Sequence, residues 1–206
     1  MRRTKQEAEQ TRRRIMAAAL RTFNRRGIAH TTMEHIAGTA GVTRGAIYWH
    51  FTDKHALLRA IREDVALPLV DKADFTLLND RESDPLERVE RFLLDLVHAV
   101  EGDSRTRLVF AVMSFKCEYV GELEAELDDY ARKIEHVRKT LKQIYSQARE
   151  RRQLRAGLTP DIAALETAVF LAGLMRVCLL EEHGMHIARH AKHLIAAHVA
   201  SRRAAA

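Results

Sequence analysis

Basic and aromatic side chains gather beside a glycine in the segment TRGAIYWHFTDK, residues 43–54. The guanidinium of Arg44 could donate two hydrogen bonds to the O6 and N7 atoms of a guanine, a contact worth roughly 1–3 kcal/mol of base discrimination. Gly45 would let the backbone come close to a partner, and Tyr48 could pack on a thymine methyl group or reach a phosphate. The segment therefore predicts contact with double-stranded DNA.

The other polar residues of this region suit the DNA backbone. His50 and Lys54 could hold phosphates and so set the register without reading the sequence, and two threonines could add hydroxyl or N–H contacts. Trp49 has two interpretations, because it could face the groove or belong to the hydrophobic core. The predicted DNA-contacting residues are Thr32, Thr43, Arg44, Gly45, Tyr48, Trp49, His50 and Lys54.

A first short helix is needed to support this face. Thr31 and Glu34 lie three residues apart before an apolar run, which predicts a capping box and a helix that begins near Met33. Gly41 can adopt the positive φ that ends such a helix without a Cβ clash.

A second short helix would carry the DNA-contacting side chains. Thr43 can accept an N–H bond as its N-cap, and we expect the helix to run from about Arg44 to Phe51. Ile47 and Phe51, four residues apart, would face inward and leave the other side chains outward. The two helices form a helix-turn-helix, whose second helix lies in the DNA major groove.

The charge of the chain is concentrated in the same region. The first 60 residues hold 12 Lys and Arg against 4 Asp and Glu, a net charge of +8, whereas the remaining 146 hold 22 against 24, a net of −2. A locally basic surface neutralises phosphates and releases counterions, which supplies much of nonspecific DNA affinity. Basic residues of the N-terminus could reach a minor groove or form a solvated tail.

Three segments of the chain resemble a known family. Residues 41–54, GVTRGAIYWHFTDK, closely resemble the DNA-binding domain of the tetracycline-repressor (TetR) family, and residues 4–27 are similar to its first helix. Residues 115–124, FKCEYVGELE, resemble the drug-efflux repressors typified by AcrR. The resemblance implies a repressor that binds a palindromic operator as a homodimer and is released by a small hydrophobic or aromatic molecule. Its expected targets are a multidrug efflux pump operon, its own gene, or both.

The rest of the chain has helical periodicity, no alternating strand pattern and few helix breakers. We expect an all-α fold of about nine helices, with a three-helix DNA-binding domain at residues 1–53 and a helical-bundle ligand-binding and dimerisation domain at residues 54–206. Pro68 should kink or end the fourth helix. Pro85 and Pro160 should begin later helices, and the helix from Pro160 should end near Gly184.

In the family that this chain resembles, the helical bundle binds a small molecule. Apolar inner faces and a few polar side chains supply candidate contacts, although an apolar residue of this kind is more often ordinary core. The apolar candidates are Leu69, Leu93, Leu96, Val97, Phe110, Met113, Val137, Leu141 and Phe170. The polar candidates are Ser114, Cys117, Glu118 and Arg176.

The resemblance also places the homodimer interface on the last two helices. Residues 165–174 mix small and apolar side chains, which would let helices of two subunits approach closely. The alternative is an ordinary buried helix within one subunit. A dimer would present two recognition helices to half-sites about 34–36 Å apart.

Other chemistry has little support in the sequence. His183, His186, His190 and His193 recur at intervals that can bind zinc or nickel, but a polar surface explains them better, so we expect no metal site and no cofactor. Cys117 and Cys178 are expected to be buried thiols. The chain has no glycine-rich phosphate loop and no nucleophile elbow, so we expect no enzyme activity.

The cellular location and the choice between repression and activation have less support in the sequence than the DNA-binding segment has. No apolar run approaches the ~20 residues that a membrane span needs, and the N-terminus is too polar for a signal peptide, so we expect a cytoplasmic protein without a membrane partner. A transcriptional activator, a metal-responsive regulator of the same fold and a nonspecific DNA-binding protein stay open as alternatives.

Overall fold

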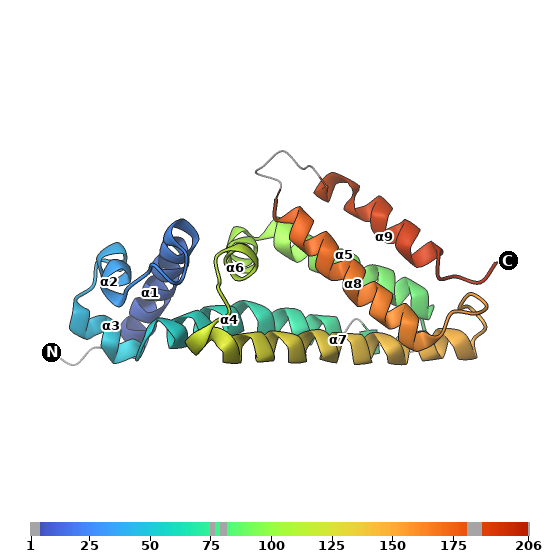
Figure 1. The fold of residues 1–206 in the computed structure, drawn as a ribbon, viewed down its shortest axis with the longest axis horizontal. Coiled ribbons are helices and arrows are strands. Elements are labelled where there is room, and N and C mark those ends of the chain that lie inside the picture. The colour runs from blue at the N-terminus through green and yellow to red at the C-terminus, as the bar shows by residue number, and fades with distance from the viewer. Residues whose placement is uncertain (1–4, 75–76, 79–81, 181–186, 206) are drawn as a thin grey trace. The chain divides into compact units, whose positions relative to one another are not determined.

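The computed structural model describes residues 5–74, 77–78, 82–180 and 187–205, and this part of the chain is almost entirely helical (Figure 1). The α-helices are α1 (Lys5–Arg26), α2 (Met33–Ala40), α3 (Arg44–His50), α4 (Lys54–Asp74), α5 (Pro85–Gly102), α6 (Ser104–Phe115), α7 (Glu124–Glu150), α8 (Pro160–Cys178) and α9 (Ala191–Ala200). Two short 3₁₀ helices, η2 (Gly121–Leu123) and η4 (Ala188–His190), precede α7 and α9. The predicted all-α fold is confirmed.

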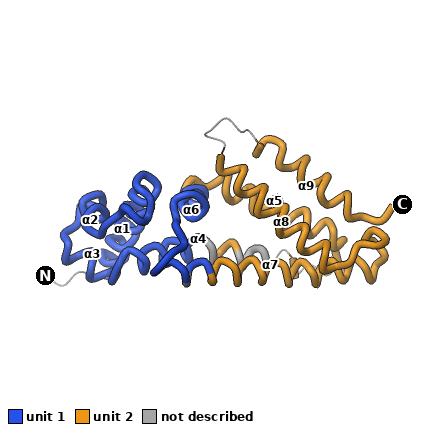
Figure 2. Tube along the Cα trace, viewed as in Figure 1, with its two compact units in different colours: residues 1–67, 105–127 blue, residues 68–104, 128–206 orange. Residues whose placement is uncertain are grey.

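The chain divides into two compact units (Figure 2). Unit 1 combines residues 1–67 with residues 105–127, and unit 2 combines residues 68–104 with residues 128–206. Unit 1 therefore holds α6 and the first turn of α7 as well as the helix-turn-helix. The expected division into a DNA-binding domain that ends at residue 53 and a ligand-binding domain that follows it is a division by function, and it stays a prediction.

The core of unit 1 lies where α1 packs against α2. Ile15, Ala19 and Phe23 recur along one face of α1 and are completely buried, as the helical spacing predicted. Ile36 of α2 and Ile47 of α3 are completely buried as well. The short helices are thus held by apolar contacts, because helices of seven or eight residues are marginal on their own.

The core of unit 2 is formed by apolar residues of α5, α7, α8 and α9. Tyr145 of α7 lies completely buried in this cluster. Its hydroxyl is hydrogen-bonded to Thr167 of α8 over 2.7 Å, which satisfies a polar group that would otherwise be costly to bury. Thr167 Oγ1 in turn lies 2.9 Å from His198 Nε2 of α9. This chain of polar groups connects three helices through the core.

Capping residues mark the beginning of two helices of unit 2. Asp84 Oδ1 accepts hydrogen bonds from the amides of Leu86 (2.7 Å) and Glu87 (3.3 Å), and Pro85 occupies the first turn of α5. Thr159 accepts from the amide of Ile162 over 3.3 Å ahead of Pro160. The predicted beginnings of α5 and α8 are confirmed.

Two predicted helix ends differ from the structure. α4 continues through Pro68 to Asp74, so the proline does not end the helix, and the alternative, a kink at Pro68, stays a prediction. α8 ends at Cys178 instead of near Gly184, and residues 181–186 lie outside the described residues. Across the described part of the chain, no helix combines the length and apolar character required to cross a membrane.

Candidate nucleic-acid interface

The helix-turn-helix begins with a capping box that the sequence placed one residue too early. Thr32 is the N-cap of α2: its Oγ1 accepts from the His35 amide over 3.2 Å, and its own amide donates to His35 Nδ1 over 3.3 Å. Thr31 is buried and donates to the carbonyl oxygen of Gly27 over 2.7 Å. The pairing of Thr31 with Glu34 is therefore wrong, because histidine takes the place where glutamate or glutamine is usual.

The turn between α2 and α3 has the predicted glycine geometry. Gly41 adopts φ 62° and ψ 40°, a left-handed conformation that costs glycine little. The amide of Val42 donates to the carbonyl oxygen of Ala37 over 3.0 Å and closes the end of α2. Thr43 Oγ1 then accepts from the Ala46 amide over 3.2 Å and caps α3.

One face of α3 is buried and the other is exposed, as predicted. Ile47 is 0% exposed and Phe51, at the end of the helix, is 5% exposed. Trp49 is 72% exposed, which excludes the interpretation that it belongs to the core of the free subunit. The side chains of Thr32, Thr43, Arg44 and Tyr48 are exposed too, whereas His50 is half-buried beside Trp49, with ring centroids 4.5 Å apart.

Gly45 lies on the exposed face with open space beside it. A Cβ atom added there would meet no atom within 4 Å. The fold of the free subunit therefore does not require a glycine at this helical position, although glycine weakens a helix. This is the pattern expected where a partner must approach the backbone closely.

Lys54, at the beginning of α4, contacts the protein itself. Its ammonium group donates to the carbonyl oxygens of Ile28 (3.0 Å) and Ala29 (3.2 Å), in the turn between α1 and α2. The amide of Ile28 donates to the carbonyl oxygen of Lys116, at the end of α6, over 3.1 Å. Lys54 thus has a positioning role that the sequence did not indicate, and its predicted phosphate contact stays a prediction.

A buried carboxylate joins α4 to the first turn of α7. Glu126 is 3% exposed, and its Oε1 lies 3.1 Å from Arg59 Nε, while its Oε2 pairs with Arg62 Nη1. Both arginines belong to α4. A buried charge of this kind requires its partners, so the three residues hold the two helices together within unit 1.

The predicted effector contacts of unit 2 are largely part of its core. Leu93, Val97 and Leu141 are at most 2% exposed within the apolar cluster. Leu96, Val137 and Phe170 pack against that cluster and are partly exposed. Leu69 is half-buried on α4, and Arg176 is exposed on α8. Core packing already explains the burial of the six residues that lie in the cluster or pack against it, and the contact of all eight with an effector stays a prediction.

The remaining effector candidates lie in unit 1. Phe110, Met113 and Ser114 of α6 are half-buried, as is Cys117, and Glu118 is exposed. Burial raises the pKa of the Cys117 thiol, which makes it less nucleophilic than an ordinary cysteine. Neither Cys117 nor Cys178 forms a disulfide; Cys178 is buried as predicted, whereas the prediction of a buried thiol is wrong for Cys117, which is half-buried.

No sequence pattern indicated the stacked histidine of unit 2. The ring of His198 lies parallel to that of Phe170, with centroids 4.0 Å apart, and burial together with the Arg202 guanidinium lowers its pKa to about 4. The spacing of the sequence instead indicated four periodic histidines, at positions 183, 186, 190 and 193. Of these, His183 and His186 lie outside the described residues, and His190 and His193 are exposed. The described part of the chain holds no group of three or more potential metal ligands.

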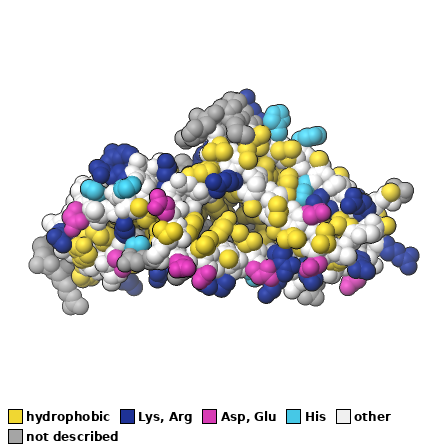
Figure 3. All heavy atoms as spheres, viewed as in Figure 1, with side chains coloured by type: hydrophobic (Ala, Val, Ile, Leu, Met, Phe, Trp, Pro, Cys, Tyr) yellow, Lys and Arg dark blue, Asp and Glu magenta, His cyan; other side chains and the backbone are white. Residues whose placement is uncertain are grey.

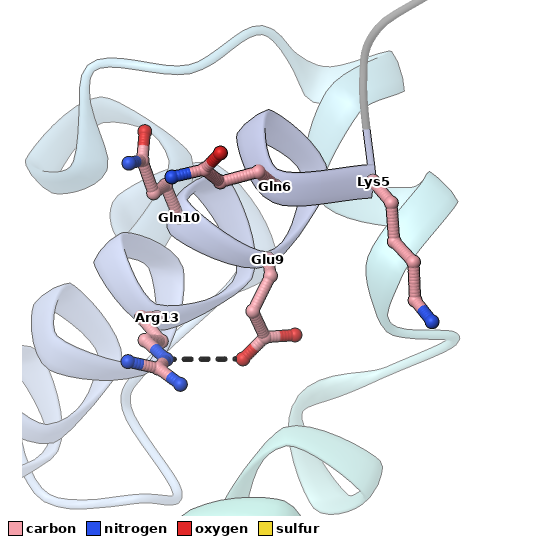
Figure 4. Close-up of a pocket in the computed structure, with 5 residues that line it drawn as sticks. All are labelled: Lys5, Gln6, Glu9, Gln10 and Arg13. Carbon is pink, nitrogen blue, oxygen red and sulfur yellow. Dashed lines mark hydrogen bonds and ion pairs between the residues drawn. The ribbon is translucent and has the colours of Figure 1, made fainter.

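A surface depression on α1 has no features of a ligand site. Its lining residues are Lys5, Gln6, Glu9, Gln10 and Arg13, which all come from one helix (Figure 4). Arg13 Nε donates to Glu9 Oε1 over 3.1 Å within this lining. Such an exposed pair between successive turns is typical of a solvated helix face.

Two regions of the chain match known families. Residues 15–61 match the family described as bacterial regulatory proteins, tetR family. Residues 84–201, more than half of the chain, match the C-terminal region of the MAATS-type transcriptional repressors.

Individual proteins are similar along nearly the whole chain. The HTH-type transcriptional regulator AcrR of Shigella flexneri is 32% identical over 199 residues, which cover 95% of this chain and 90% of AcrR. NalD, the secondary repressor of the MexAB-OprM multidrug efflux pump in Pseudomonas aeruginosa, superposes with a TM-score of 0.84 at 28% identity, covering 97% of this chain and 98% of NalD. A complex of SmeT with triclosan superposes with a TM-score of 0.80 at 26% identity, covering 94% of this chain and 91% of SmeT.

Proposed function

Since the chain belongs to the TetR family of bacterial transcriptional regulators, we propose that it is a ligand-responsive repressor that binds a palindromic operator as a homodimer. The observation that carries this proposal is the exposed face of α3, with Arg44, Tyr48 and Trp49 above the buried Ile47. In a helix-turn-helix, this is the face that enters the major groove. The repressor would act in the cytoplasm, on the operon of a multidrug efflux pump, on its own gene, or on both.

The proposed DNA contacts divide into reading and positioning roles. Arg44 reads a guanine, and Gly45 admits the backbone of α3 to the groove. Thr32 and Thr43, at the beginnings of two helices, bind phosphates together with His50 and Lys54. Tyr48 and Trp49 pack on base edges or sugars, which suits their exposure in the free subunit.

The homodimer is proposed to form through α8 and α9. Ile162, Leu165 and Val169 of α8 are 46%, 47% and 66% exposed, and hydrophobic side chains gather over this helix (Figure 3). They recur three and four residues apart, so they share one face of the helix. Ala172 and Gly173, which are exposed as well, would let a partner helix approach closely. An apolar stripe of this kind is typical of a surface that a second subunit covers.

The proposed effector is a small hydrophobic or aromatic molecule bound by the C-terminal bundle. The triclosan complex of SmeT and the partly exposed apolar side chains of Leu96, Val137 and Phe170 support this class. Release would follow from coupling through α4, which is one continuous helix from Lys54 to Asp74. A coupling of about 1–3 kcal/mol would lower operator affinity about 5- to 150-fold.

Footprinting on the DNA upstream of the gene, with triclosan and other hydrophobic compounds added in turn, tests the proposal. We expect a protected palindrome whose half-sites lie about one helical turn apart, or a multiple of it, and protection that one of the compounds removes. Protection without sequence preference, with a steep dependence on salt, would instead indicate a nonspecific DNA-binding protein. Reporter expression in a deletion strain separates repression from activation, because loss of a repressor raises expression of the target.

A further inference from the structure

Glu34 of α2 is paired with Arg44 of α3 on the exposed face of the helix-turn-helix. Glu34 Oε1 lies 3.4 Å from Arg44 Nε, and the two side chains are 53% and 74% exposed. The Arg44 guanidinium also lies over the ring of Tyr48, 5.7 Å from its centroid. Three side chains from two helices thus form one exposed cluster at the residue that we propose reads a base.

Stability does not explain this ion pair well. An exposed pair of this kind contributes little to the stability of the fold. A free arginine side chain loses rotamer entropy when it is fixed, and the contacts with Glu34 and Tyr48 restrict Arg44 before DNA binds. A side chain that is already held in the free protein pays less of this cost when DNA binds.

The atoms used in the contact suit base recognition. The ion pair is formed through Nε of Arg44, and the guanidinium carries two further nitrogens, Nη1 and Nη2, that can donate hydrogen bonds. Because the guanidinium is planar, a contact at Nε and the Tyr48 ring beneath it restrict the directions that the two terminal nitrogens can take. The fork of these nitrogens is what donates to guanine O6 and N7.

We propose that Glu34 is a positioning and specificity-determining residue, which orients Arg44 for base reading and opposes binding to DNA that offers Arg44 no guanine. The inference rests on the reading role of Arg44 proposed above. A carboxylate near the phosphates repels DNA of any sequence, and only a cognate contact of Arg44 compensates for that repulsion. A backbone N–H and the Thr32 hydroxyl, with a further contribution from Arg44, lower the pKa of Glu34, so the carboxylate stays charged near neutral pH.

The test compares wild type, Glu34→Gln, Arg44→Ala and the double variant on three DNA probes. A duplex selected from a random pool with the wild-type protein is the cognate probe. The second probe is a set of duplexes, in each of which one guanine that the wild-type protein protects in the cognate duplex is replaced by another base. The third probe is a scrambled duplex. Glu9→Gln is the matched control, because it removes a glutamate that pairs with Arg13 on α1, in the same unit.

We expect Glu34→Gln to bind the scrambled duplex more tightly, and its preference for the cognate over the guanine-replaced probe to fall about fivefold or more. Glu9→Gln should leave that preference unchanged. In the Arg44→Ala background, Glu34→Gln should have no further effect on preference, since the two residues act through one contact.

Two results would overturn the inference, and only the second would also contradict the proposed role of Arg44 in reading a base. If Arg44→Ala loses the preference while Glu34→Gln keeps it, Glu34 does not position Arg44, and the proposed function stands. If Arg44→Ala keeps the full preference, the reading role of Arg44 is wrong and the role of Glu34 falls with it. A merely structural Glu34 would change binding to all three probes by one factor, with or without Arg44.

Discussion

The ammonium group of Lys54 donates a hydrogen bond to the carbonyl oxygen of Ile28 over 3.0 Å. The same residue, Ile28, donates its amide to the carbonyl oxygen of Lys116 over 3.1 Å. The turn between α1 and α2 is therefore held from two sides within unit 1, by the beginning of α4 and by the end of α6. A displacement of either helix would therefore alter the position of the turn that leads into α2.

Replacement of Lys54 separates its contact with Ile28 from its proposed contact with phosphate. Lys54→Gln keeps a donor for the carbonyl oxygen but removes the charge. If Lys54 binds a phosphate, the dependence of log K on log salt should become shallower by about one for each subunit, and so by about two for the dimer, equally on cognate and scrambled DNA. Lys116→Gln, which keeps the carbonyl bond to Ile28, is the control. An unchanged salt dependence for Lys54→Gln would leave Lys54 with the positioning role alone.

Glu126 should be important for the stability of unit 1. Glu126→Gln removes the carboxylate that pairs with Arg62, which is 11% exposed, and breaking a buried pair in this way costs about 3–5 kcal/mol. The half-exposed Arg59 can regain water and should reduce the loss toward the lower value. Urea unfolding measures the change. Glu124→Gln, an exposed change in the same turn, should cost less than about 0.5 kcal/mol. Equal effects of the two variants would contradict this role of Glu126.

Local signals were sufficient to predict where several helices begin and end. Gly41, Thr43 and the Thr159–Pro160 pair each affect only their own turn, so their effect can be read from neighbouring residues. Pro68 shows the limit of such reasoning. Proline disfavours the interior of a helix, yet α4 continues through it, so the neighbouring residues alone did not decide between a kinked helix and an ended one.

The contacts between different helices could not be predicted from neighbouring residues in the sequence. Glu126 meets Arg59 across 67 residues, and Lys54 meets Ile28 across 26. Effector contacts were hard to separate from core for a related reason. Leu93 and Leu141 have the apolar spacing of a pocket wall and of a packed core alike, and the structure places them in the core cluster.

Gly45→Ala should stabilise the protein and weaken its binding to DNA. Alanine favours a helix over glycine by about 0.5–1 kcal/mol, and the new Cβ meets no atom of the free subunit. On DNA, the same methyl group would occupy space that the groove needs. We expect a higher midpoint of thermal unfolding together with a lower operator affinity. Gly38→Ala, the same change at an open position of α2, should stabilise without that loss. Unchanged affinity of Gly45→Ala would show that α3 does not approach DNA at this position.

Val169→Glu should prevent dimerisation. Val169 is 66% exposed on α8, and a carboxylate there would have to lose its water in a helix-to-helix interface. Sedimentation analysis at micromolar concentration should show a monomer, and operator affinity should fall because two half-sites are no longer bound together. Val120→Glu changes a residue of the same type and similar exposure, 70%, outside α8 and should remain dimeric. A dimeric Val169→Glu would move the interface to another surface.

His198 should make the protein less stable in mild acid. Its pKa is about 4 in the folded chain and about 6.5 in an unfolded one, because burial and the Arg202 guanidinium disfavour the charged ring. Between these values the unfolded chain binds a proton that the folded chain does not, so this contribution to stability is full above pH 6.5 and is lost as the pH falls toward 4. Because the ring is only partly buried, we expect a loss of about 1–2 kcal/mol between pH 7 and pH 4.5.

The variant His198→Gln isolates this effect from that of other titrating groups. Glutamine keeps a hydrogen-bonding group for Thr167 but cannot be protonated, whereas Arg202 and its partner Glu166 remain in place. The free energy of unfolding of wild type minus that of His198→Gln should therefore change with pH. It should have its highest value at pH 7 and fall as the pH is lowered, because only the wild type loses the His198 contribution. Urea unfolding at pH 7, 5.5 and 4.5 measures it. Parallel pH dependence of the two proteins would mean that His198 is protonated in the folded chain as readily as in the unfolded one, and that the Tyr145–Thr167–His198 chain does not require a neutral ring.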